Sequence, residues 1–287
     1  MWNAITELDL SPINHVLDEK ILRTVLARTV SLRKLDLTGC SVPDAGLSAL
    51  RLVPNLTSLV LAFCEEFTMQ GLVYVSTLSR LEELDCNNLG ELRKTTGQLD
   101  SVVERFLGVL DAQKSTLKRL NLCGAYMQGL RCLEKFTALT TLSLYDVTLQ
   151  EPIVDDPSPF LALAKLTRLD TLELSNMRRQ VISNYELLEL SFTLTNLKHL
   201  GIARNSSLSS DGLANMHYLN KLEVINIMGA WDMQTHTITA HLRNCTNLKT
   251  LVWTCGSANP VGDVKDVKAA FSQPVDVITR GEFMYVM

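Results

Sequence analysis

Apolar and polar residues follow a fixed pattern in the stretch 31–40, SLRKLDLTGC. Apolar side chains stand at Leu32, Leu35, Leu37 and Cys40, which we number positions 1, 4, 6 and 9 of a unit. Because successive side chains of a strand point to opposite faces, positions 4 and 6 share one face and positions 3, 5 and 7 share the other. The pattern therefore predicts a short strand with one buried and one exposed face.

The same unit recurs along most of the chain. Its first positions are Ile5, Leu32, Leu56, Leu81, Leu117, Leu139, Leu169, Leu197, Leu222 and Leu248. Successive first positions lie between 22 (139 − 117) and 36 (117 − 81) residues apart. A single unit cannot bury its own apolar face, so the units are expected to stack, and strands joined by crossovers of one sense are parallel.

The segments between these strands have helical features. Residues 44–47 read Asp-Ala-Gly-Leu, and related Gly-Leu openings occur at 68–72 and 210–213. A Ser, Thr or Asp at such a place can cap the first turn of a helix. We therefore expect a parallel sheet on one side of the chain and helices on the other.

These features resemble the leucine-rich repeat family, in its cysteine-containing, ribonuclease-inhibitor-like subclass. The residues that carry the resemblance across 5–256 are Cys40, Cys64, Cys245, Asp44 and Asp211. The resemblance implies an α/β solenoid, or horseshoe, of about ten repeats with a concave parallel sheet and convex helices. The subclass is best known from substrate receptors of F-box ubiquitin ligases, but the first repeat here begins by Ile5, so we expect no F-box before it.

We divide the chain into a solenoid over 1–256 and a C-terminal capping segment over 257–287. In this segment, residues 264–271 are expected to form a helix and residues 275–278 a strand. Val275 lies 27 residues (275 − 248) after Leu248, which indicates a degenerate repeat that covers the open edge of the sheet. The apolar end, 283–287, either folds back as a cap or docks on another protein.

Two insertions interrupt the period. Residues 95–113 have the apolar spacing of an amphipathic helix, and residues 151–159 form an acidic loop with three prolines, which exclude regular structure. Insertions in solenoids fall on loops of one face and often contact partners. They are equally consistent with surface length that the fold tolerates.

Candidate binding residues follow from the exposed positions of the strands. Acidic side chains gather at positions 3 and 5 toward the N-terminus, and apolar ones toward the C-terminus. The candidates are Glu7, Asp9, Asp36, Glu83, Asp85, Val224, Met228 and Val252. We infer a protein partner with a basic segment, which charge would guide, and an apolar anchor, which would hold it. The competing interpretation is that exposed strand faces are simply polar, with valine present for its β-propensity.

The sequence offers no catalytic, cofactor or metal site. His241 and Cys245 have the spacing of two ligands on one helical face, but Cys245 occupies the buried cysteine place of the repeat. Cys123 could be exposed at position 7, yet no histidine accompanies it in a nucleophile motif. Phosphate-binding glycine loops and hydrolase or zinc-protease motifs are absent from the sequence.

Composition restricts the class of partner and the cellular compartment that we expect for this chain. The formal net charge of -4 argues against a nucleic-acid ligand, which needs clustered lysine and arginine. The sequence contains no apolar run of eighteen residues and no secretory leader, and its seven cysteines lack a disulfide framework. These features predict an intracellular, cytoplasmic location without membrane contact, with nucleus and organelles left open.

The functional prediction is a non-enzymatic scaffold or adaptor for protein–protein interaction, as a subunit of a larger multiprotein assembly. A curved sheet of about ten strands offers a broad surface that suits a protein better than a small molecule. The alternative is the substrate-recognition subunit of a ubiquitin ligase that acts with a separate docking protein.

Overall fold

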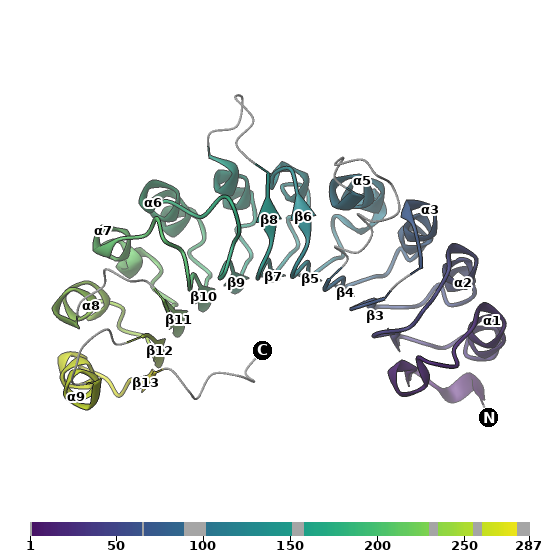
Figure 1. Cartoon of the computed structure of the whole chain (residues 1–287), viewed down its shortest axis with the longest axis horizontal. Helices are drawn as coiled ribbons and strands as arrows, with labels where there is room; N and C mark the ends of the chain where they lie inside the picture. Colours follow the sequence, from purple (N-terminus) through teal and green to yellow (C-terminus); the bar gives the residue numbers. More distant parts are fainter. Residues whose placement is uncertain are drawn as a thin grey trace.

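The computed structural model describes residues 2–64, 66–88, 102–150, 158–229, 235–254 and 260–279. Over these residues the chain forms a curved α/β solenoid, with strands along the inner side of the arc and helices along the outer side (Figure 1). The predicted architecture of a concave parallel sheet and convex helices is confirmed.

The concave sheet contains eleven strands among the described residues, and its strands follow one another in chain order. They are β1 (Glu7–Asp9), β2 (Lys34–Asp36), β3 (Ser58–Val60), β4 (Glu83–Asp85), β5 (Arg119–Asn121), β7 (Thr141–Ser143), β9 (Thr171–Glu173), β10 (His199–Gly201), β11 (Val224–Asn226), β12 (Thr250–Val252) and β13 (Asp276–Ile278). Every neighbouring pair is parallel. The first ten of these strands cover positions 3 to 5 of their units. The register of β13 aligns Val277 with Leu251, so the first position of the last unit is Pro274, one residue before the predicted Val275.

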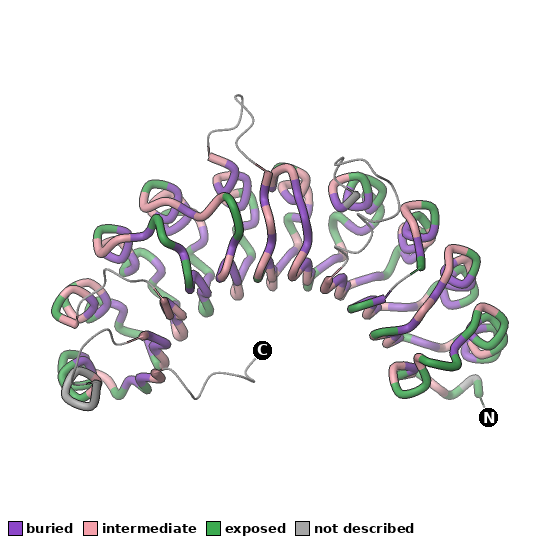
Figure 2. Tube along the Cα trace, in the orientation of Figure 1, coloured by how far each residue is buried: buried purple, intermediate pink, exposed green. Residues whose placement is uncertain are grey.

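The register places the position-4 residues in one unbroken row. Leu35 faces Leu8 on one side and Leu59 on the other, and the same correspondence continues to Leu251 and Val277. Side chains at positions 1, 4 and 6 fill the space between sheet and helices as one continuous core. Figure 2 shows buried residues along the wall between sheet and helices, with exposed residues on the outer helices and mostly intermediate ones on the concave strands.

The outer wall alternates between α-helices and 3-10 helices. The α-helices are α1 (Glu19–Arg28), α2 (Asp44–Leu47), α3 (Met69–Leu72), α5 (Val102–Val109), α6 (Asn184–Thr193), α7 (Ser210–Leu213), α8 (Thr235–Leu242) and α9 (Pro260–Ala270). The 3-10 helices are η1 (Trp2–Ala4), η2 (Ser11–Ile13), η3 (Ser48–Leu52), η4 (Val73–Thr77), η6 (Leu110–Gln113), η7 (Arg131–Leu133), η8 (Pro159–Lys165) and η9 (Met216–Tyr218). The repeat of only 22 residues, from 117 to 139, has room for the three-residue η7 alone.

A second sheet, which the sequence pattern did not predict, joins two repeats near the middle of the arc. Strands β6 (Tyr126–Met127) and β8 (Thr148–Leu149) pair in parallel, away from the concave sheet (Figure 1). A bridge between Thr148 and Arg178 extends the contact to the following repeat. Met127 and Leu149 are fully buried, so these short strands add to the core.

Several sequence predictions concern segments outside the described residues. These are the beginning of the insertion helix, 95–101, most of the acidic loop, 151–157, the apolar end, 283–287, and single repeat positions such as Leu89 and Cys255. Within the described part, the insertion is helical as α5 and ends in η6. Helix α9 and strand β13 occur where the C-terminal helix and strand were predicted. The division at residue 256 stays a prediction.

The Gly-Leu openings of the outer helices are explained by contacts between repeats. Thr68 caps its own helix as expected, and Ser209, one residue before the predicted opening, caps α7. Asp44 does not cap α2, whose cap residue, Pro43, makes no side-chain bond. The Asp44 carboxylate instead accepts the backbone N–H groups of Thr68 (2.6 Å) and Gly71 (2.9 Å) in the next repeat. Asn184 accepts the N–H of Ser209 in the same way, at 3.1 Å.

Gly71 should therefore be intolerant of a side chain. A Cβ at Gly71 would collide with the Asp44 carboxylate, whereas a Cβ at Gly108 in α5 would meet open space. We expect Gly71→Ala to lower the free energy of unfolding by about 1–3 kcal/mol. Gly108→Ala, the matched control, should raise it by up to about 1 kcal/mol because alanine favours helix. Urea unfolding followed by circular dichroism measures both, and equal effects would contradict this account.

A row of left-handed residues follows the strands at position 8. Its described members are Gly39, Phe63, Asn88, Gly124, Asp146, Asn176, Arg204 and Gly229. Seven of their backbone N–H groups donate to a carbonyl of the next repeat, as from Phe63 to Asn87 at 3.0 Å, and that of Gly229 donates to the Thr254 hydroxyl at 3.1 Å. Glycine, asparagine and aspartate tolerate this conformation, but Phe63 adopts a φ of 55° with its side chain 52% exposed.

Phe63 should destabilise the repeat that carries it. Replacement by glycine relieves the left-handed backbone, while replacement by alanine removes the same ring and keeps the constraint. We expect Phe63→Gly to unfold at a higher urea concentration than Phe63→Ala. The free energy of unfolding of the glycine variant should be higher by about 1–2 kcal/mol. An alanine variant as stable as the glycine variant would show that this turn carries no strain.

Candidate functional site

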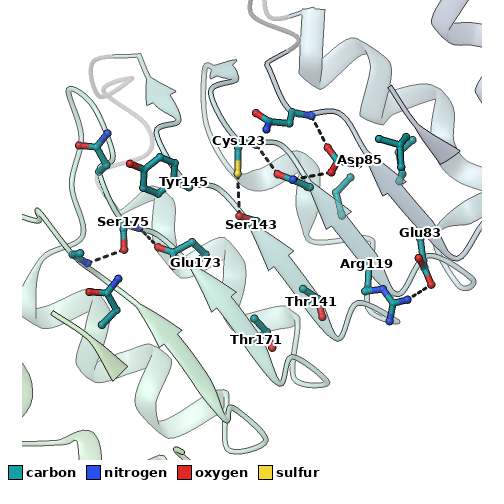
Figure 3. A pocket seen from close by; sticks show the side chains of 18 of the residues that line it. Glu83, Asp85, Arg119, Cys123, Thr141, Ser143, Tyr145, Thr171, Glu173 and Ser175 are labelled. Atoms are coloured by element: carbon teal, nitrogen blue, oxygen red, sulfur yellow. Dashed lines mark hydrogen bonds and ion pairs between the residues drawn. The ribbon is translucent and has the colours of Figure 1, made fainter. Parts of the chain in front are cut away.

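The concave face holds an open groove of about 880 Å³ that runs from β3 to β11. Side chains at positions 3, 5 and 7 line it, because these positions point away from the buried leucines. Its central wall includes Asp85, Cys123, Ser143, Glu173 and Ser175, which Figure 3 shows side by side on neighbouring strands. The groove is therefore part of the concave surface from which the candidate residues were drawn.

The structure brings some of the predicted residues together and separates others. Glu83, Asp85 and Met228 line the groove, while Glu7, Asp9 and Asp36 lie on β1 and β2, before the groove begins. Val224 is half-buried on β11, and the groove lining does not include it. Val252 on β12 is 0% exposed, so the expectation that it presents an apolar surface to a partner is wrong.

Position 5 has a structural role that the sequence analysis missed. Its side-chain oxygen accepts the backbone N–H of position 7, as in Asp9 to Ser11 (2.9 Å), Asp36 to Thr38 (2.8 Å) and Asp85 to Asn87 (2.8 Å). Asn121, Glu173 and Asn226 make the same bond in other repeats. Such bonds end a strand and start a turn, so these polar residues serve the fold as well as the surface.

Charges at position 3 are paired between neighbouring strands. Glu7 forms an ion pair with Lys34 at 2.8 Å, and Glu83 forms one with Arg119. The Glu7 carboxylate raises the pKa of the Lys34 ammonium. The N-terminal part of the concave face is therefore a mixed surface, and its acidity is lower than the carboxylates alone suggest.

Glu173 is the buried carboxylate of the groove. It is 2% exposed, and its Oε1 atom accepts the backbone N–H of Ser175 at 2.6 Å. Its side chain lies across Gly201, the position-5 residue of the adjacent strand. Burial raises the pKa of Glu173, and the hydrogen bonds from Ser175 oppose that rise. Position 5 is a glutamate in repeat seven and a glycine in repeat eight. Comparison of these two neighbouring repeats could have identified Glu173 from the sequence.

Cys123 and Cys245, the two thiols that the sequence analysis considered, lack the properties of nucleophiles. Cys123 shares a hydrogen bond of 3.1 Å with the Ser143 hydroxyl, and burial together with the nearby carboxylates of Asp85 and Glu173 raises its pKa. Burial raises the pKa of Cys245 to about 12. The reactive form of cysteine is the thiolate, so neither side chain is activated.

The described residues contain no group of three or more His, Cys, Asp or Glu side chains that could hold a metal ion. In the same part of the chain, no helix is both long and apolar enough to span a bilayer. The groove thus offers hydrogen bonds, charge and shape to a ligand.

Sequence comparisons with family models and with curated proteins give no match. The structure is similar to that of an internalin, inlF, from Listeria monocytogenes strain 4b F2365, with a TM-score of 0.57 and 15% identity over 97% of this chain and 83% of that one. It is also similar to TLR13 in a complex with ssRNA13, with a TM-score of 0.51 and 16% identity over 80% of this chain and 30% of that one. This chain thus spans less than a third of the TLR13 chain. The likeness shows the leucine-rich repeat fold.

Glu173 should make stability depend on pH. Its folded-state pKa is raised, so the folded chain binds a proton more tightly than the unfolded chain, and stability falls as pH rises through that pKa. We expect Glu173→Gln to be more stable than the wild type at about pH 7, with the difference shrinking toward about pH 4.

Glu223→Gln is the matched control, because Lys249 lowers the pKa of Glu223 and the sign reverses. This variant should lose a small amount of stability at about pH 7, and less toward acid. Urea midpoints measured across this pH range test both variants. A Glu173→Gln variant that is less stable than the wild type at neutral pH would contradict the account.

Proposed function

We propose that this chain is a non-enzymatic protein-interaction scaffold and that the concave groove binds its partner. The observation that carries the proposal is the continuity of the groove across the strands from β3 to β11. Six steps between adjacent strands separate these two, which at about 4.8 Å each corresponds to about 29 Å. An extended peptide of about nine residues covers that length, whereas a small molecule does not.

The chemistry of the groove favours a protein with a basic segment and an apolar anchor. Asp85 and Glu173 supply carboxylates to the central wall, and Met228 supplies apolar surface at the far end. Opposite charges speed and orient the encounter, and a buried apolar contact slows dissociation. The ion pair of Glu83 with Arg119 reduces the attraction of a basic segment to the β3 end of the groove. The carboxylates at the centre therefore contribute most of that attraction.

RNA is the competing ligand, because the solved TLR13 structure is a complex with ssRNA13. Two features weigh against RNA here. The formal net charge is -4, and the groove contains a buried carboxylate, Glu173, at its centre. A phosphate backbone near that carboxylate would be repelled, and the groove arginines Arg119 and Arg204 are too few to compensate.

The finer assignments belong to the same proposal. A cysteine-containing subclass is supported by hydrogen bonds at position 9: the Cys64 thiol donates to the Leu37 carbonyl at 2.9 Å, and Asn205 donates to the Leu174 carbonyl at 3.2 Å. Cysteine therefore fills an apolar place while serving a backbone acceptor of the previous repeat. We further propose an intracellular, cytoplasmic subunit of a larger assembly, capped by residues 257–287.

The alternative proposal is the substrate-recognition subunit of a ubiquitin ligase, which would need a separate docking chain. Its support is the position-9 cysteines, which this subclass shares with F-box receptors. Recovery of a cullin-type scaffold with the tagged chain distinguishes it from the general scaffold.

The groove should be tested with substitutions that keep the fold. We expect Thr141→Lys together with Thr171→Lys, both in the groove lining, to abolish recovery of the specific partner in affinity purification followed by mass spectrometry. Thr24→Lys on the exposed side of α1 is the matched control and should retain the partner. Partners that survive the groove variant unchanged would place binding elsewhere and end this proposal.

A further inference from the structure

The Glu173 side chain lies across strand β10 in the wall of the groove. The position-5 and position-7 residues of this repeat are Gly201 and Ala203, so it presents almost no side chain between its neighbours. Glu173 on β9 and Met228, two residues after β11, belong to the repeats on either side of β10, and both line the groove together with Ala203. We call these four residues the Glu173 notch.

The carboxylate in this notch has a hydrogen bond but no cation. Oε1 accepts the Ser175 N–H, and Glu173 takes part in none of the ion pairs found among the described residues. Arg204 follows Ala203 in the sequence. Its Cγ atom lies 3.1 Å from the place where a Cβ on Gly229 would stand, one repeat further on.

A buried carboxylate without a counter-charge is unfavourable. Glutamine would fill the same volume and avoid the cost of burying charge. Gly201 in turn provides the space that this side chain occupies, since a Cβ there would collide with the carboxylate. Glutamate and glycine at the same position of adjacent strands thus form a fitted pair.

We propose that the Glu173 notch receives a lysine or arginine side chain of the partner protein; the inference rests on the proposed function of the groove. The cation supplies the missing counter-charge to the carboxylate, in surroundings that strengthen the attraction because little water remains there. The aliphatic stem of the same side chain packs on Ala203 and Met228, as long basic side chains commonly do. One residue of the partner thereby satisfies both the charged and the apolar requirement of the groove.

The test uses defined peptides with the whole 287-residue chain. Blocked heptapeptide libraries with a fixed central lysine, arginine, norleucine or glutamate are passed over the immobilised protein. We expect retention of the lysine and arginine libraries over the other two. Affinities of the retained peptides, measured by fluorescence polarisation, should fall about tenfold or more in Glu173→Gln. The same variant should be at least as stable as the wild type, a combination that a merely structural role would not produce.

Two further variants sharpen the result. Gly201→Ala displaces the carboxylate and should also weaken the basic peptides, while Glu223→Gln lies outside the groove lining and should bind them as the wild type does. If Gly201→Ala does not fold, Glu173→Gln still decides.

The failure of the inference and the failure of the proposed function are distinguishable. Peptides that bind Glu173→Gln as tightly as the wild type, and are lost with the Thr141→Lys and Thr171→Lys changes, overturn the notch and leave the groove as a binding site. Absence of any retained peptide overturns both. Binding of a single-stranded RNA oligonucleotide in the groove also overturns both.

Discussion

The contact between each repeat and the next is the interaction on which the rest of the structure depends. Leucine faces leucine at position 4 from one strand to its neighbour, and no repeat buries this face alone. Because the side chain at position 4 points into the core between sheet and helices, the side chains at positions 3, 5 and 7 must point to the concave side. The row of buried leucines and the groove are therefore two faces of the same alternation, and a change in strand register would exchange them.

The spacing of apolar residues was sufficient to predict the fold. A period of two within each strand and a longer period between strands define a parallel sheet with covering helices. Both periods can be read directly from the order of apolar and polar residues. Features that depend on neighbouring repeats were not predictable in this way. The pairing of β6 with β8, the bond from Asp44 to the next repeat and the left-handed backbone of Phe63 each need coordinates, because the partner lies about a repeat away in sequence.

The candidate site was predicted in outline and corrected in detail. The rule for positions 3, 5 and 7 identified Glu83, Asp85 and Met228, which line the groove, but it could not tell that Val252 is buried. It also treated the position-5 aspartates as free surface, although they accept backbone hydrogen bonds that end the strands. Glu173 was passed over because its meaning comes from the glycine beside it, which only an alignment of adjacent repeats reveals.

The small sheet of β6 and β8 has a consequence for the shape of the arc. A horseshoe bends because adjacent repeats stand about 4.8 Å apart along the inner sheet but about 8–10 Å apart where helices pack on the outside. Between repeats five and six a second pair of strands replaces that wider spacing at one level of the wall. We therefore expect a smaller wedge angle between these two repeats than between neighbours whose outer sides are joined by helix packing, and so a straighter stretch at the middle of the arc.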